Sequence, residues 1–169
     1  MTAFRSSLVR RAGALTVLCA LASSVVSAVD KDKAMYVGGT VSRLEEKAEG
    51  LVSTDSDTEF RFNAGGKGSV TIPYEAITSL EYGQKAGRRV AVGILISPLA
   101  LFSKKRKHFL TVTFNDEAGK EQAAIFELGK DIVRTTLKVF EVRSGKKVEP
   151  QDVEACKQFK TPKECEASK

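Results

Sequence analysis

The feature that most constrains the fold is one run, HFLTVTFNDEAGKEQAAIFEL, at positions 108–128. Residues 109–114 alternate between two sets of side chains, as strand residues do when successive side chains point to opposite faces of a sheet. A polar turn follows at residues 116–120, and an apolar return strand follows at residues 124–128. The run therefore predicts an antiparallel β-hairpin, the clearest one in the chain.

Shorter strands are predicted before this hairpin. Residues 35–44 contain a glycine pair among β-branched and apolar residues, which indicates a strand with a bulge or bend. Two half-buried strands are predicted at 51–55 and 58–63, and the glycine-rich sequence AGGKG after them indicates a turn. Residues 69–83 read as two strands with a bend at Pro73 and Tyr74.

The hydrophobic period changes after the hairpin. Residues 131–145 place Ile132 or Val133, Thr136 or Leu137, and Phe140 on one face at helical spacing. Asp131 favours a helix start, and Gly145 is a good stop. The predicted fold is mainly β with a C-terminal α-helix: a small antiparallel barrel or two packed sheets, capped by one amphipathic helix that covers open edges.

The N-terminal 28 residues have the layout of a secretory signal peptide. A basic region containing three arginines precedes an apolar run from Ala12 to about Val26, and Val26-Ser27-Ala28 resembles a cleavage site. We expect cleavage after Ala28, and an exported protein that is periplasmic or secreted. About 141 residues would then remain, enough for one domain with a real core.

Positive charge is concentrated in one part of the chain. The whole sequence has 27 Lys and Arg against 21 Asp and Glu, and the signal peptide removes three arginines and no acid, which leaves +3. Between Glu81 and Asp116 there are seven basic residues and no acid, so the remainder of the mature chain carries about −4. The overall basicity is therefore weak evidence for nucleic-acid binding, and we expect no nucleic-acid partner.

Two cysteines remain after export, Cys156 and Cys165. An even number of closely spaced cysteines in an exported chain favours a disulfide, here one that closes a loop in a polar tail at 149–169. This pair does not fit a zinc site, because no histidine and no second cysteine pair lie nearby in the sequence. We therefore predict a disulfide and no metal.

Three stretches resemble the pleckstrin-homology-like superfamily, in particular its GRAM and bacterial PH-like branches. They are VTIPYEAITSLEYG, HFLTVTF and AIFELGKDIVRTTLKVFEVRSGK, the last being a strand that enters the helix. The resemblance covers residues 35–148, and the chain also resembles exported bacterial proteins. The resemblance to the pleckstrin-homology-like superfamily implies a binding module with no cofactor. Phosphoinositide-binding members carry clustered cations on their first two strands, whereas here three cations are mixed with five acids, so that headgroup site is not carried over.

Residues 85–107 form an insertion in this pattern, with an apolar stretch between two basic clusters. As a helix, residues 90–102 would reach about 20 Å, short of the ~30 Å hydrocarbon core, and Gly93 and Pro98 would interrupt it, so a membrane crossing is the weakest interpretation. Burial in the core and insertion into a membrane surface both remain open. The predicted membrane- or partner-contact residues are Arg88, Arg89, Ile94, Leu95, Ile96, Leu99, Leu101, Phe102, Lys104, Lys105, Arg106 and Lys107.

Catalytic constellations are hard to assemble from this sequence. His108 is the single histidine, which leaves little for a Ser-His-Asp unit or a histidine-based metal site. We expect a non-enzymatic exported binding module whose partner is an anionic membrane surface or a protein, with no small-molecule cofactor. The alternatives are a secreted structural or inhibitory protein in which the segment is core, and a carboxylate-based hydrolase.

Overall fold

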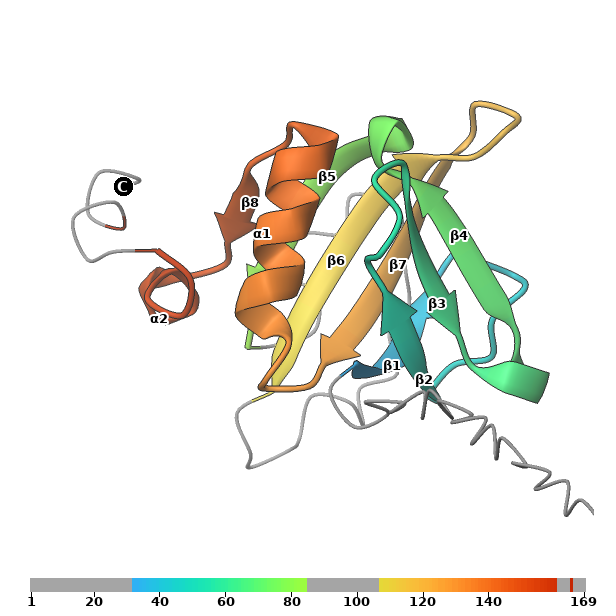
Figure 1. The fold of residues 1–169 in the computed structure, drawn as a ribbon, viewed down its shortest axis with the longest axis horizontal. Helices are drawn as coiled ribbons and strands as arrows, with labels where there is room; N and C mark the ends of the chain where they lie inside the picture. Colours follow the sequence, from blue (N-terminus) through green and yellow to red (C-terminus); the bar gives the residue numbers. More distant parts are fainter. Residues whose placement is uncertain (1–31, 85–106, 161–164, 166–169) are drawn as a thin grey trace, which may run out of the picture.

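The computed structural model describes residues 32–84, residues 107–160 and Cys165. The architecture is one eight-stranded sheet in the order β4-β3-β2-β1-β7-β6-β5-β8, with a helix near the C-terminus (Figure 1). Its strands are β1 (Lys33–Gly39), β2 (Ala48–Ser53), β3 (Glu59–Asn63), β4 (Ser69–Pro73), β5 (Ile77–Gly83), β6 (His108–Asn115), β7 (Glu121–Leu128) and β8 (Val148–Pro150). The helices are α1 (Val133–Ser144) and α2 (Val153–Cys156), with single turns of 3-10 helix, η1 (Gly65–Lys67) and η2 (Tyr74–Ala76). The prediction of a mainly β fold with a C-terminal helix is confirmed.

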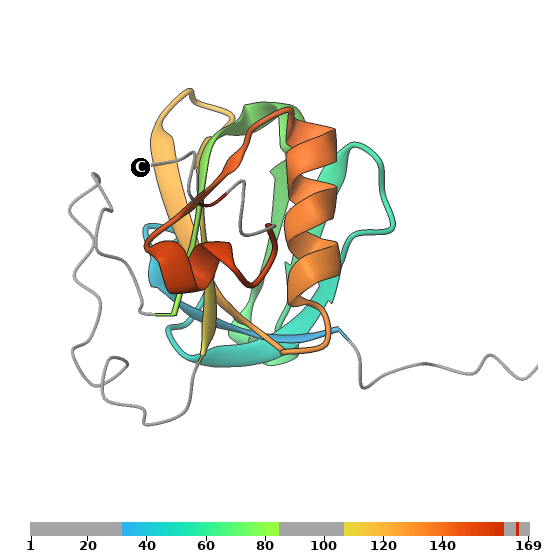
Figure 2. The same ribbon diagram turned by 90° about the vertical axis from the view of Figure 1, so that its left-hand side faces the viewer.

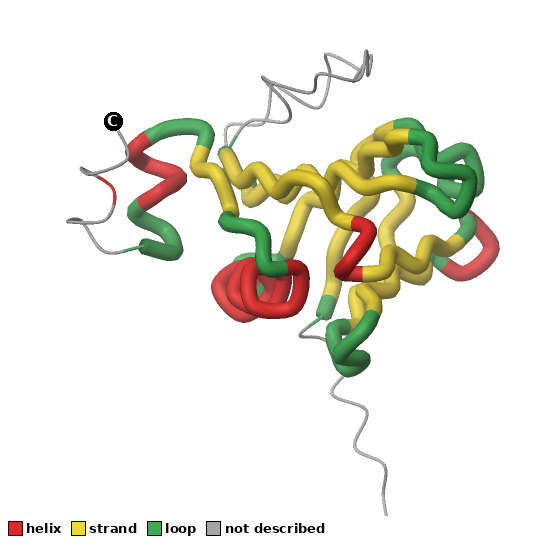
Figure 3. Tube along the Cα trace, turned by 90° about the horizontal axis from the view of Figure 1, so that it is seen from above, coloured by secondary structure: helices red, strands yellow, loops and turns green. Residues whose placement is uncertain are grey.

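The sheet consists of two antiparallel meanders joined along one pair of strands. Strands β1 to β4 follow one another as neighbours, and so do β5 to β7. The two meanders are joined because β1 also pairs antiparallel with β7, where Tyr36 lies opposite Phe126. Seen from above, the sheet curls into a half-barrel, and α1 lies on the open side of the curl (Figure 3).

The core fills the space between the curled sheet and α1. Its largest side chains are aromatic, and they come from both meanders and the helix. The Phe60 ring lies 5.4 Å from the Phe126 ring and 4.8 Å from the Phe140 ring. All three side chains have 0% exposure, so they hold strands distant in sequence against the helix.

Helix α1 is amphipathic, as the sequence pattern predicted. Val133, Thr136, Leu137 and Phe140 are buried on one face. The helix ends where Gly145 takes a left-handed conformation, φ 68°, and donates its backbone N–H to the Glu141 carbonyl. Glycine stops a helix at this position because it lacks the Cβ that disfavours left-handed backbone.

The predicted bulge in the first strand is present. The β1–β7 register shifts between Tyr36 and Gly38, so one residue of β1 has no direct partner on β7. Thr40, just beyond the strand, then closes the pairing. Its backbone N–H donates to the Ala123 carbonyl at 2.9 Å, and its Oγ1 accepts from the Ala123 N–H at 2.9 Å.

The C-terminal region is more ordered than the polar tail that the sequence suggested. Its first residues form β8, which pairs parallel to β5 with Val148 opposite Leu80. Asp152 then caps α2 by accepting a hydrogen bond from the Ala155 N–H at 2.7 Å. Val148 and Ala155 are fully buried and belong to the main core, so the tail completes the edge of the sheet (Figure 2).

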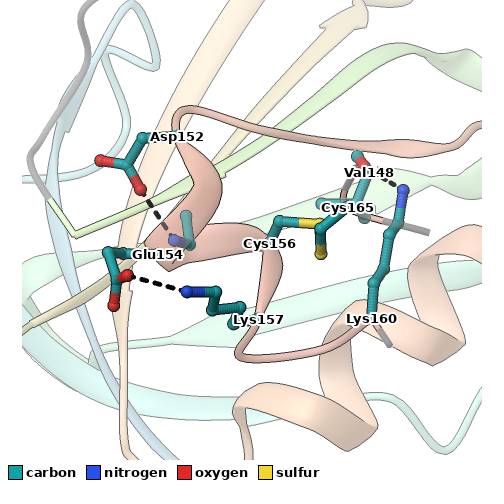
Figure 4. The surroundings of a disulfide bond; sticks show 8 residues. Val148, Asp152, Glu154, Cys156, Lys157, Lys160 and Cys165 are labelled. Atoms are coloured by element: carbon teal, nitrogen blue, oxygen red, sulfur yellow. Dashed lines mark hydrogen bonds and ion pairs between the residues drawn. A yellow bond between two sulfur atoms is a disulfide. The ribbon is translucent and has the colours of Figure 1, made fainter. Parts of the chain in front are cut away.

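Cys156 and Cys165 form the predicted disulfide, with their Cα atoms 5.7 Å apart (Figure 4). The bridge closes a short loop with a sequence separation of 9. Short loops restrict the unfolded chain less than long ones, so its contribution to the free energy of unfolding is at most about 3 kcal/mol. A disulfide is compatible with an oxidising, exported location.

Oxidation of this pair is directly measurable. Protein recovered from an exporting host without reductant should be lighter than the reduced chain by two hydrogen atoms, because each thiol loses one when the S–S bond forms. Intact-mass spectrometry with and without reduction checks this. Two cysteines that alkylate freely before reduction would contradict the prediction.

Candidate binding surface

The predicted contact segment leaves and re-enters the sheet at one place. β5 ends at Gly83, β6 begins at His108, and Gly83 lies opposite Phe109 in an antiparallel pair. Residues 84–107 therefore connect two hydrogen-bonded neighbours. A hairpin connection needs only two to five residues, so the fold does not require an insertion of this length for its topology.

Most of the predicted contact residues lie outside the described residues. These are Arg88, Arg89, Ile94, Leu95, Ile96, Leu99, Leu101, Phe102, Lys104, Lys105 and Arg106. Lys107 is described, and its Nζ forms an ion pair with Glu127 Oε2 at 2.7 Å. The two side chains are 27% and 23% exposed, so the pair is partly shielded from water. The Lys107 charge is thus already matched by an acid of β7.

A second polar contact lies beside this ion pair. Tyr82 Oη and His108 Nδ1 are 2.6 Å apart, and the two rings are nearly parallel. Burial raises the pKa of Tyr82 to about 12. The pKa of His108 is lowered, first by burial and then by the nearby Lys130 charge. The neutral forms of both groups are therefore favoured, and the contact ties the ends of β5 and β6 together.

The outer face of the sheet carries a separate apolar cluster next to these ends. Val37, Phe109 and Ile125, from β1, β6 and β7, are 4%, 3% and 0% exposed. Among the described residues, Met35 is the one partly buried hydrophobic side chain packed on this cluster. We call Met35, Val37, Phe109 and Ile125 the outer cluster. Sequence analysis missed it, although the two-sided apolar character of 109–114 and 123–126 was a signal for it.

A further candidate surface is a groove with a volume of about 840 Å³. It runs between α1 and the segment after α2. Among the described residues, its basic lining side chains are Arg134, Lys138, Lys146, Lys147 and Lys160, and its one acidic lining side chain is Glu141. The signal in the sequence was the spacing of Arg134, Lys138 and Val142, which places them on one helix face, but the tail that forms the other wall was not predictable.

Neither metal-binding nor membrane-spanning elements are found in the described part of the chain. No three histidine, cysteine, aspartate or glutamate side chains gather there as metal ligands. In the same residues, no helix combines the length and apolarity needed to cross a bilayer. Compared with known protein families and with curated proteins, the chain matches none.

Proposed function

We propose that this protein is an exported, non-enzymatic binding module of the pleckstrin-homology-like kind, which attaches to an anionic membrane surface through segment 88–107. The observation that carries the proposal is the pairing of Gly83 with Phe109, because it holds both ends of the segment together where two neighbouring strands end and begin. Basic residues on both flanks can then meet the same anionic surface while the apolar residues between them enter the headgroup boundary.

One further feature supports the proposal. The two meanders with one helix after β7 also have the arrangement that the family resemblance implies, a curled antiparallel sheet capped by a C-terminal helix. A protein partner that docks on the same segment is the alternative that the experiment below also addresses.

A second candidate function rests on the outer cluster. Three of its side chains are almost fully buried, although the described residues supply one further hydrophobic neighbour. This favours the view that the apolar residues of segment 88–107 serve the fold, in a secreted structural or inhibitory protein. The two candidates make opposite predictions for charged substitutions in the segment.

Removing basic charge from the segment should weaken membrane binding. Lys104, Lys105 and Arg106 are changed together to glutamine, and Lys107 is kept because it pairs with Glu127. At roughly 1 kcal/mol for each cation, binding to vesicles containing 30% phosphatidylserine should fall about 100-fold, and its salt dependence should flatten. Vesicle flotation over a salt series measures both effects. Unchanged binding, or binding that is as strong to neutral vesicles, would refute the electrostatic part of the proposal.

The apolar half of the segment is tested by Ile94→Asp with Leu99→Asp. For a membrane contact, flotation should be lost even at low salt while the melting temperature stays within about 2 °C of wild type. A large fall in melting temperature would instead place these residues in the fold, because a buried aspartate would lack a partner. If the wild-type protein itself does not float, and both variants keep its melting temperature, a protein partner is favoured instead.

A further inference from the structure

The groove between α1 and the tail is more positively charged than the rest of the described chain. Of the described side chains that line it, five are basic and one is acidic. Glu141 does not neutralise the other basic side chains of the groove. Its Oε1 accepts from the Val148 N–H at 3.0 Å, and its Oε2 faces Lys138 Nζ at 3.7 Å. Among the described residues, Lys146 and Lys147 have no acidic partner for their side chains. The groove is therefore electropositive, whereas the mature chain outside residues 82–115 carries a total charge of about −4.

The two walls of the groove are fixed before anything binds. Arg134 Nε, from the first turn of α1, donates to the Gln158 carbonyl at 2.8 Å. Lys160 Nζ donates to the Val148 carbonyl at 3.3 Å (Figure 4). The same Nζ lies over the Phe159 ring, 5.2 Å from its centroid. The disulfide between Cys156 and Cys165 closes the loop that contains Gln158, Phe159 and Lys160. Each cation uses one donor in these contacts and keeps others free, so ligand binding would cost little ordering of the site.

Apolar surface accompanies the charge. Val142 is 69% exposed, although it lies on the helix beside the groove, and the partly buried Phe159 lines the other wall. Arg134, Lys138 and Val142 follow one another at i, i+4 spacing, so they form one stripe along the helix. A ligand that runs along this stripe would meet cations and apolar side chains in turn.

We infer that this groove is a docking site for an extended acidic peptide segment of a partner protein, with apolar side chains between its carboxylates. The lining reaches from the first turn of α1 to Lys147 beyond its end. A 12-residue helix is about 18 Å long, which five or six residues of extended chain would span. In extended chain, successive side chains point to opposite sides, so alternating acidic and apolar residues fit the cationic rim and the apolar wall.

The shape favours a peptide over a membrane. The site is hollowed along the helix between two walls, whereas a bilayer surface is contacted by protruding side chains. The described residues that line the groove are not those of segment 88–107, so the inference goes beyond the function proposed above. Each can fail without the other.

The test uses the full oxidised protein and a fluorescently labelled, acetylated hexapeptide of alternating aspartate and leucine. Fluorescence anisotropy should show binding in the micromolar range, and the same peptide with asparagine in place of aspartate should bind at least tenfold more weakly. Lys138→Gln, Lys146→Gln and Lys147→Gln together should weaken binding of the acidic peptide at least tenfold and reduce its salt dependence.

The matched control removes the same number of charges elsewhere, as Lys67→Gln, Lys120→Gln and Lys130→Gln. These side chains are exposed and do not line the groove, so binding should change less than twofold. Equal weakening by both triple variants would reduce the effect to net charge and overturn the inference. Failure of the acidic peptide to bind below 1 mM would overturn it as well.

Vesicle flotation of the groove triple variant distinguishes a peptide site from a membrane contact. If it floats like wild type but loses the peptide, the groove site stands apart from the membrane segment. If it loses vesicles and keeps the peptide, the groove is a membrane contact and the peptide inference is wrong. Should the triple variant melt early, Lys147→Glu alone provides the same comparison, because Lys147 is exposed and lies beyond the helix.

Discussion

Replacing Phe140 by alanine should lower the free energy of unfolding by about 3–5 kcal/mol. The side chain has 0% exposure, and its ring lies 4.8 Å from Phe60 and 5.6 Å from Tyr74. Truncation removes these contacts and leaves a cavity that rigid neighbours fill only in part. Since a domain of this size has a total stability of about 5–15 kcal/mol, the loss should be evident as a large fall in the urea midpoint.

The control for this change lies two residues further along the same helix. Val142 is 69% exposed, so Val142→Ala should alter the free energy of unfolding by less than about 0.5 kcal/mol. Both variants are measured by urea denaturation followed by circular dichroism. If Phe140→Ala has the same midpoint as Val142→Ala, then α1 does not hold the core together and the capped-sheet description fails.

Phe140 matters because it connects parts of the fold that are not neighbours in the sheet. Phe60 comes from β3 in the first meander, and its ring is also 5.4 Å from Phe126 of β7 in the second. Tyr74 comes from η2, between the meanders. A single ring of α1 therefore packs against the first meander and the link to the second.

The parts of this fold that could be predicted from sequence are those with local signals. The hairpin at 108–128 is present as β6 and β7, because alternation and a polar turn depend only on neighbours in the chain. The helix was predicted from 131 and is observed from Val133 to Ser144, with its end set by Gly145. Element boundaries are harder to predict than element types, and β2 accordingly begins at Ala48, three residues before the strand predicted at 51–55.

The parts that could not be predicted depend on distant residues. The pairing of β8 with β5 joins Val148 to Leu80, and nothing in the short sequence Val-Glu-Pro indicates a strand. The same holds for the candidate sites. Lys107 stays a predicted contact residue, and no sequence pattern indicated its ion pair with Glu127 on the neighbouring strand. The groove beside α1 required the position of a tail that residue patterns alone do not give.

A second large effect is expected from a single methyl group at Gly39. This residue has φ +154°, and a Cβ added there would lie 2.2 Å from the Ala123 carbonyl oxygen. That oxygen already accepts the Thr40 N–H at 2.9 Å, so it belongs to the β1–β7 junction that joins the two meanders. Gly39→Ala must distort this junction, and backbone strain together with overpacking should lower the free energy of unfolding by about 2–6 kcal/mol.

The neighbouring glycine is the matched control. A Cβ at Gly38 would first meet Glu46 Oε1 at 3.7 Å, which is an ordinary contact with a flexible side chain. Gly38→Ala should therefore change the free energy of unfolding by less than about 1 kcal/mol, with a small gain because the unfolded chain loses freedom. Thermal and urea denaturation of the two variants measure the difference. The two variants have the same composition and change neighbouring residues. Equal free energies of unfolding would mean that the backbone at Gly39 is not needed to join the meanders. A loss of stability in Gly39→Ala alone would show that the junction of β1 with β7 depends on Gly39.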